Sequence, residues 1–235
     1  MAENLIQLRI GEVPDNIINQ KLTELYQENW NGYISEIRGN LNATNPQLIC
    51  VSNEYASAEI KVVVVGQETF FWGGEFDQEI REGRYPTIND LQLLYNKFAN
   101  EKFGYNSPFW NFMKRLKLKS DGIGIVSTNI IKIGRNGKGY DNEVKDLTKE
   151  YFNVIRKELE ILQPDLVVFT TGPKYDKIIK EFLGEVNILL DNNKLAIYKI
   201  EGLSYGAIRT YHPHYMSRKR LYFETINYVT NLILR

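Results

Sequence analysis

Hydrophobic positions along the chain alternate between short runs rich in β-branched residues and longer segments with helical spacing. The short runs are KVVVVG (61–66), GIGIVSTNIIKIG (122–134) and DLVVFTTG (165–172), and a fourth strand is predicted in LAIYKIEG or AIRTYH. Strands that are apolar throughout and alternate with helices are typical of a parallel sheet covered on both faces. The pattern therefore predicts an α/β fold, a three-layer α/β/α sandwich around a central, mostly parallel four-stranded sheet.

Segments with helical spacing separate these runs. LQLLYNKFANEKFG and PFWNFMKRLKL precede the second strand, and RLYFETINYVTNLILR is expected to form a closing helix. DLTKEYFNVIRKELEIL is expected to form one helix that places on one face Leu147, Tyr151, Ile155, Leu159 and Leu162. Because the sequence contains no repeat or long linker, we expect a single domain over residues 1–235, with residues 1–58 as a mostly helical part packed on the core.

Composition and charge exclude several classes of protein. Hydrophobic residues make up 43% of the chain, and Lys plus Arg and Asp plus Glu both number 29, so attraction to polyanions has to come from local patches. The single cysteine, Cys50, excludes an internal disulfide and a cysteine-based zinc or iron–sulfur site. The N-terminus lacks the layout of a signal peptide, and no apolar run approaches the roughly 20 residues that span a bilayer. We therefore expect a cytoplasmic monomer without a membrane segment.

Polar residues follow the predicted strands at their carboxyl ends, where ligands bind in such folds. Gln67 and Glu68 end the first strand, and Asn129 lies near the end of the second. Glu68 is either a capping or turn carboxylate or a catalytic group in a cleft. Asn is depleted in strands, so Asn129 is either paired with a neighbouring loop or presents its amide to the edge of a planar ligand.

The two histidines of the chain, His212 and His214, fall in one pentapeptide, YHPHY, after the last predicted strand. A zinc site needs a third ligand at suitable spacing, so we expect no metal site, and no motif indicates a cofactor. His212 is either a loop histidine bonded to the backbone or an imidazole facing an oxygen that gains negative charge during a reaction.

Aromatic and basic residues gather near the same predicted edge of the sheet. The segment after the first strand carries the rings of Phe70, Phe71, Trp72, Phe76 and Tyr85 among charged residues and glycines, a pattern that suits stacking on a flat heterocycle. Two loops, KIGRNGKG and IRTYHPHYMSRKR, carry basic residues without an acid. Their charges are either simply solvated or form a surface that contacts phosphates.

The order of these motifs resembles that of the uracil-DNA glycosylase superfamily. GQETFF resembles the family's GQDPYH motif, with Glu68 in place of the aspartate, and HPHYMS resembles HPSPLS, retaining His212 and Ser217. The asparagine of STNIIKI stands where the family recognises uracil, and SPFWNFMKRL and DLVVFTTGPK resemble further segments of its members. The resemblance covers about residues 60–220.

The resemblance implies a role for each matching residue. Glu68 and His212 would be catalytic, the first activating water and stabilising the cationic sugar and the second stabilising the uracil anion. Residues implied to bind the flipped base are Gln67, Asn129, Phe70, Phe71 and Tyr85. Residues implied to contact DNA are Met216 as the wedge, Ser217, Arg218, Lys219, Lys132 and Lys174.

The sequence thus predicts a DNA glycosylase that excises uracil or a related damaged base from single- or double-stranded DNA. Two alternatives stay open, a non-catalytic protein that binds nucleic acid or nucleotides on the same fold, and a hydrolase of free nucleosides. A continuous basic rim favours DNA as the partner, and an acidic rim favours a small ligand.

Overall fold

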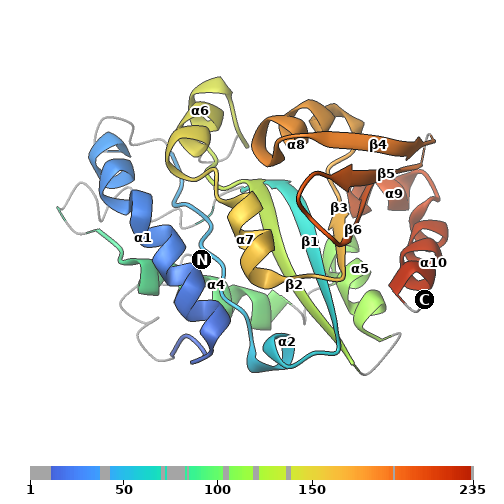
Figure 1. Cartoon of the computed structure of the whole chain (residues 1–235), viewed down its shortest axis with the longest axis horizontal. Coiled ribbons are helices and arrows are strands. Elements are labelled where there is room, and N and C mark those ends of the chain that lie inside the picture. The colour runs from blue at the N-terminus through green and yellow to red at the C-terminus, as the bar shows by residue number, and fades with distance from the viewer. Residues whose placement is uncertain are drawn as a thin grey trace. The chain divides into compact units, whose positions relative to one another are not determined.

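The computed structural model describes residues 12–37, 43–69, 72, 83, 85–102, 106–118, 122–135, 139–192 and 194–233. These residues form a mixed α/β fold in which helices flank a central sheet (Figure 1). The predicted fold class is therefore confirmed.

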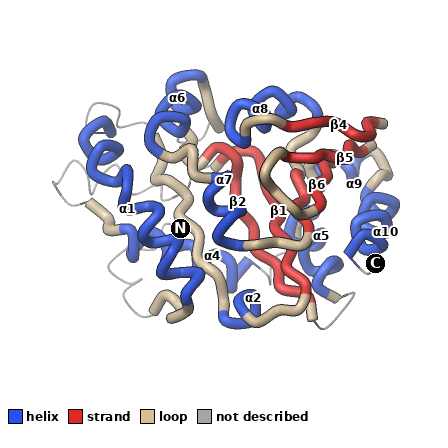
Figure 2. Tube along the Cα trace, viewed as in Figure 1, coloured by secondary structure: helices blue, strands red, loops and turns tan. Residues whose placement is uncertain are grey.

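The sheet has six strands rather than the four expected, in the order β2-β1-β3-β6-β5-β4. Their bounds are β1 Ile60–Glu68, β2 Ile123–Ile131, β3 Leu166–Phe169, β4 Val186–Asp191, β5 Leu195–Ile200 and β6 Gly206–Thr210. Strands β1, β3 and β6 run parallel, whereas β6, β5 and β4 pair antiparallel. Figure 2 marks the strands in red. Both of the C-terminal candidates form strands, and β4 escaped prediction because it is an exposed edge strand without a buried apolar run.

Contacts divide the chain into two compact units, each assembled from three stretches. Unit 1 takes its described residues from Met1–Asn53, Glu68–Ala99 and Asn129–Ile161, and unit 2 takes them from Glu54–Gln67, Asn100–Thr128 and Leu162–Arg235. One boundary falls between Gln67 and Glu68 in β1, and another falls directly before Asn129 in β2. The expectation of a single domain stays a prediction.

Unit 2 contains most of the sheet. Residues 62–65 of β1 and 166–169 of β3 are almost completely buried, as expected for strands covered on both faces. The helices of this unit are α2 Asn53–Ala56, α5 Pro108–Lys117, α8 Asp176–Leu183, α9 Pro213–Arg218 and α10 Tyr222–Ile233. Helices α5, α9 and α10 pack against one another, and Tyr222 Oη donates to the Pro108 carbonyl at 2.9 Å. The predicted closing helix is α10.

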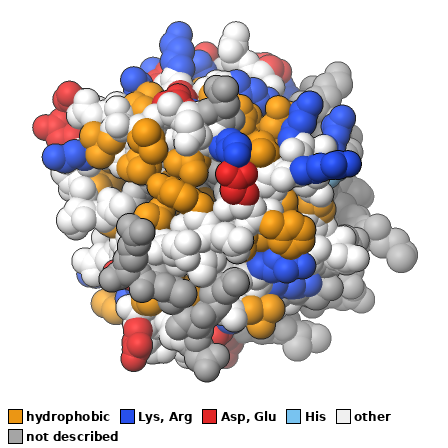
Figure 3. All heavy atoms as spheres, turned by 90° about the vertical axis from the view of Figure 1, so that its right-hand side faces the viewer, with side chains coloured by type: hydrophobic (Ala, Val, Ile, Leu, Met, Phe, Trp, Pro, Cys, Tyr) orange, Lys and Arg blue, Asp and Glu red, His pale blue; other side chains and the backbone are white. Residues whose placement is uncertain are grey.

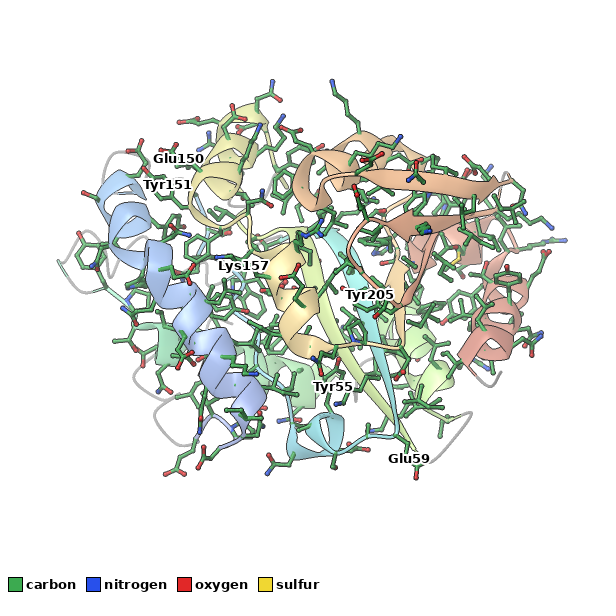
Figure 4. The ribbon with its side chains drawn as sticks, viewed as in Figure 1. Tyr55, Glu59, Glu150, Tyr151, Lys157 and Tyr205 are labelled. Carbon is green, nitrogen blue, oxygen red and sulfur yellow. The ribbon has the colours of Figure 1, made fainter. Side chains whose placement is uncertain are left out.

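Unit 1 is mainly helical, with α1 Ile17–Ile37, most of α4 Ile88–Lys102, α6 Asn142–Tyr151 and most of α7 Ile155–Leu162. Helices α1 and α6 pack closely, since a Cβ on Gly32 would lie only 2.8 Å from the Tyr151 ring (Figure 4). Lys157 of α7 also pairs with Glu28 of α1 at 2.8 Å.

The prediction of one continuous helix before β3 is wrong, because α6 and α7 are separated at residues 152–154. Phe152 leaves the helical conformation and is fully buried, with its ring centroid 5.0 Å from that of Tyr33 and 6.2 Å from that of Trp30. This packing against α1 outweighs the helical pattern of the local sequence.

Candidate active site

Glu68 ends β1 and lies half-buried in unit 1 against the loop that follows β2. A Cβ on Gly139 would lie 2.9 Å from Glu68 Oε1, and Gly139 has a φ of +75°. Only glycine adopts that backbone conformation readily and leaves room for the carboxylate. The loop therefore fixes the position of the Glu68 side chain by passing directly beside it.

Short contacts anchor the backbone on either side of this carboxylate. Thr69 is buried next to Gly134, where a Cβ would lie 2.1 Å from the Thr69 carbonyl oxygen. Thr44 ties these segments together, because its Oγ1 accepts from Gly134 N at 2.9 Å and lies 3.2 Å from Thr69 Oγ1. Thr44 thus links the segment directly after β1 to the segment after β2.

Lys132 does not lie on the surface, so its predicted contact with DNA is wrong. Its side chain is fully buried, and Nζ donates to Glu158 Oε2 of α7 at 2.6 Å. Tyr26 Oη of α1 donates to Glu158 Oε1 at 2.7 Å and accepts from Ile49 N at 3.1 Å. Burial lowers the pKa of Lys132, and Glu158 acts in the opposite direction. The lysine is a structural residue that ties the segment after β2 to α7 and, through Glu158, to α1.

Removing one partner of this buried pair is expected to destabilise the protein. Lys132→Met leaves Glu158 buried without its cation, which costs about 3–5 kcal/mol of unfolding free energy. The double variant Lys132→Met/Glu158→Leu removes the unpaired charge and should recover a large part of that loss. Urea denaturation followed by circular dichroism measures the unfolding free energy of both variants. A single variant as stable as the parent would show that the ion pair does not contribute to stability.

Arg135, the described arginine of the loop after β2, is also paired with acids. Arg135 donates from Nε to Asp141 Oδ2 at 2.9 Å and from Nη2 to Glu143. Asp141 in turn caps α6 by accepting from Val144 N at 3.1 Å, and its hydrogen bonds from Arg135 and Val144 lower its pKa. The charge of Arg135 is therefore compensated within unit 1.

Asn129 lies on β2 in unit 1, half-buried. Within the residues that the structure describes, its side-chain amide has no hydrogen-bond partner. Its predicted role in reading the edge of a base stays a prediction.

The described aromatic residues after β1 differ in burial. Trp72 belongs to the core of unit 1, with its ring 5.1 Å from that of Phe98. Tyr85 is half-buried in the segment before α4, and its role in stacking stays a prediction. Phe70 and Phe71 lie outside the described residues.

In unit 2, β1, β3 and β6 bring their carboxyl ends to the same level of the sheet. Val65 pairs with Phe169, and Phe169 pairs with Arg209, so Gln67, Thr171 and Tyr211 each follow by two positions. Gln67 is half-buried and donates from Nε2 to the Thr171 carbonyl at 2.8 Å. Its amide N–H is thus bonded to the segment that follows β3, and its contact with a base stays a prediction.

His212 follows β6 at the start of α9, half-buried. His214 N donates to His212 Nδ1 at 3.2 Å. A backbone N–H can only donate, so Nδ1 carries a lone pair and the proton of the neutral ring lies on Nε2. Burial, and secondarily the neighbouring His214, lower the pKa of His212. The site therefore holds a neutral imidazole with a preset Nε2–H donor.

Phe109 covers one face of this imidazole, a contact that the sequence reading missed. The two ring centroids lie 6.0 Å apart with an interplanar angle of 12°, a stacked arrangement. Phe109 stands in the first turn of α5, which Ser107 caps by accepting from Trp110 N at 3.4 Å. The sequence shows the Ser-Pro start of that helix. It does not show the contact of the Phe109 ring with His212, because that contact is tertiary.

Replacing Phe109 is expected to make the position of the His212 imidazole less fixed while the histidine itself is kept. Phe109→Leu should lower base release roughly 10- to 100-fold and raise the pKa of His212 toward 6.5, because the imidazole loses its stacked cover. Phe109→Tyr keeps the ring and serves as the control. Nitrogen-detected NMR gives the pKa and the tautomer directly, and an unchanged His212 titration in Phe109→Leu would contradict this role.

The residues after His212 divide between the interior and the surface. Met216 is completely buried, and its Sδ accepts from Thr210 Oγ1 at 3.3 Å, so its predicted role as an exposed wedge is wrong. Ser217, Arg218 and Lys219 are exposed at the end of α9. Lys174 is exposed after β3, with Nζ 5.2 Å from the Tyr175 ring centroid.

Together the fold and the site define a class of protein. A mixed α/β sheet carries Glu68, Asn129 and His212 at or close to the ends of three strands, where ligands bind in such folds. A family model of the uracil DNA glycosylase superfamily matches residues 53–231. The chain belongs to this superfamily. No curated protein matches the chain.

Two further findings on the described residues concern membrane-spanning helices and metal sites. None of their helices combines the length and the hydropathy that crossing a membrane requires. Nor do they contain a cluster of three or more His, Cys, Asp or Glu side chains placed to hold a metal ion.

Proposed function

We propose that the protein hydrolyses the N-glycosidic bond of uracil, or of a related damaged base, in DNA. Membership of the superfamily supports a glycosylase acting on DNA. The observation that carries the proposal is the preset Nε2–H of His212, a donor suited to a base oxygen that becomes negative as the bond breaks.

The proposed reaction assigns one half of the charge separation to each catalytic residue. The C1′–N1 bond breaks with its electron pair leaving on the base, and His212 Nε2–H donates to the base O2. Water adds its hydroxyl to C1′, and Glu68 stabilises the cationic sugar and accepts the proton of the water. The released base then takes a proton from solvent and Glu68 returns its proton to solvent, so that the atoms and charges balance.

The two proposed catalytic residues come from different units, Glu68 from unit 1 and His212 from unit 2. Asn129, whose amide is free to meet a ligand in the described structure, would read the base edge.

Release of free base from oligonucleotides tests the proposal. The protein is expected to release uracil from a labelled strand and to leave thymine in the matched strand intact. Clean DNA binding without any release would identify instead a non-catalytic binding protein on this fold.

A further inference from the structure

Polar residues at or directly after the ends of β3 and β6 are buried, although residues of this type usually lie on the surface. Thr170 and Thr210 are 0% exposed, and Thr171 is 1% exposed. On the face of the molecule that Figure 3 shows, by contrast, charged and apolar side chains lie side by side. Buried polar groups need hydrogen-bond partners, so the contacts of these segments indicate what they hold in place.

Gln67 supplies a hydrogen bond to the segment after β3. Directly after that strand, Thr170 N donates to Val65 O at 2.8 Å. One residue further along, Gln67 Nε2 donates to the Thr171 carbonyl at 2.8 Å, so the side chain continues the pairing of β1 with this segment. Because a carbonyl oxygen can only accept, this bond fixes which end of the Gln67 amide faces Thr171. The orientation of the amide is therefore set within the protein.

Gly172 connects the same segment to β6. Its N–H donates to Thr210 O at 2.9 Å. Its φ of +75° and ψ of +166° lie in a region that glycine occupies almost alone. A Cβ at this position would lie 3.4 Å from Tyr211 Cδ1, so the backbone passes directly against the Tyr211 ring. Thr171 and Gly172 thus link Gln67 to the residues that directly precede His212.

Tyr211 has a second contact that restricts its ring. The ring stacks on that of Tyr215, with centroids 4.6 Å apart and an interplanar angle of 29°. Tyr211 directly precedes His212, which stands at the N-cap of α9. A ring in contact with both Gly172 and Tyr215 limits the backbone freedom of His212, because adjacent residues share a planar peptide bond. The position of the imidazole thus depends on Tyr211 as well as on Phe109.

We propose that Gln67 is a positioning residue for His212. It acts through Thr171 and Gly172 and then through the Tyr211 ring, all of which belong to unit 2. This inference rests on the proposed function and gives Gln67 a role other than the base contact that the resemblance implies. A positioning role requires that a change at Gln67 alters His212 in the free protein, whereas a base contact requires an effect only when DNA is bound.

The imidazole of His212 in the free protein provides a test that needs no base release. Gln67→Met keeps the length of the side chain and removes the donor to Thr171. Nitrogen-detected NMR should show shifted His212 ring signals and a pKa closer to the ordinary 6.5, because a less fixed imidazole is less buried. Gln163→Met, the same change at an exposed residue before β3, should leave both as in the parent. Parent-like His212 signals in Gln67→Met would overturn the positioning role.

A pair of glycine variants tests the route through Gly172. Gly202, in the turn after β5, has the same φ of +75° and is exposed. Gly172→Ala and Gly202→Ala should both lower the melting temperature, by roughly 2–8 °C, but only Gly172→Ala should shift the His212 signals. If Gly172→Ala does not fold, Tyr211→Leu tests the same route, with Tyr211→Phe expected to keep parent-like signals. Equal His212 signals in the two glycine variants, or in the two tyrosine variants, would overturn this route.

Base release distinguishes positioning from base contact. Gln67→Met is expected to lower kcat roughly 10-fold and to leave KM within about twofold, because a misplaced imidazole weakens stabilisation of the transition state. In the His212→Ala background the same substitution should cause no further loss, since Gln67 then has no imidazole to position. A further loss in that background, or a raised KM with kcat unchanged, would show that Gln67 contacts the base and would overturn the positioning role.

The two kinds of measurement separate this inference from the proposed function. If the protein releases no base, the proposed function fails, and the NMR comparison of Gln67→Met with Gln163→Met still decides whether Gln67 positions His212. Base release combined with parent-like His212 signals in Gln67→Met overturns the positioning role alone.

Discussion

Glu68→Gln is expected to lower the rate of base release from a uracil-containing oligonucleotide by about 10³-fold. The amide keeps the size of the side chain and its place beside Gly139, but it cannot accept the proton of the attacking water or stabilise a cationic sugar. Because Glu68 is half-buried at a strand end rather than in the core, the variant should unfold at the same urea concentration as the parent. Single-turnover rates measured with excess enzyme report the chemical step directly.

The matched control lies just before the other end of the same strand. Glu59 is exposed directly before β1 begins (Figure 4), and Glu59→Gln makes the same chemical change away from the predicted site. Its rate should equal that of the parent. If Glu68→Gln retained the parent rate, the carboxylate after β1 would have no part in the chemistry, and the site would have to be sought elsewhere.

His212→Ala is expected to lower base release by about 10²- to 10³-fold. The variant removes the Nε2–H that faces the developing charge on the base, and loss of one such donor costs about that much in other enzymes. His214 supplies the control, because His214→Ala keeps the backbone N–H that bonds His212 Nδ1 and loses only an exposed side chain.

The two histidine variants together show whether base release depends on the imidazole of His212 or on the structure of the YHPHY segment. A large loss in His212→Ala with a near-parent rate in His214→Ala is the pattern the neutral donor requires. Equal losses would show that the YHPHY segment acts through its structure rather than through the imidazole of His212.

The elements that the sequence predicts well are those whose burial matches their local pattern. The valine run of β1 and the apolar run of β3 are buried on both faces, and a parallel arrangement of β1, β3 and β6 followed from that. Polar residues at the ends of such strands also indicated Glu68, Asn129 and His212, whose roles stay predictions. These inferences rest on short-range spacing, which a single sequence records.

The features that the sequence does not predict depend on partners distant along the chain. Lys132 looks like a loop cation until Glu158 is seen beside it, and Met216 looks like an exposed wedge until α9 turns it inward. Phe152 breaks a helical pattern because it packs against α1. The stack of Phe109 on His212 likewise joins residues that are far apart in sequence, so no local sequence pattern indicates it.

The most direct test of the central claim is base release by the unmodified protein from a labelled oligonucleotide with one uracil, in single and double strands. The account predicts free uracil and an abasic strand, at a rate that falls in both Glu68→Gln and His212→Ala. An intact strand after prolonged incubation with protein that binds the same DNA would contradict it.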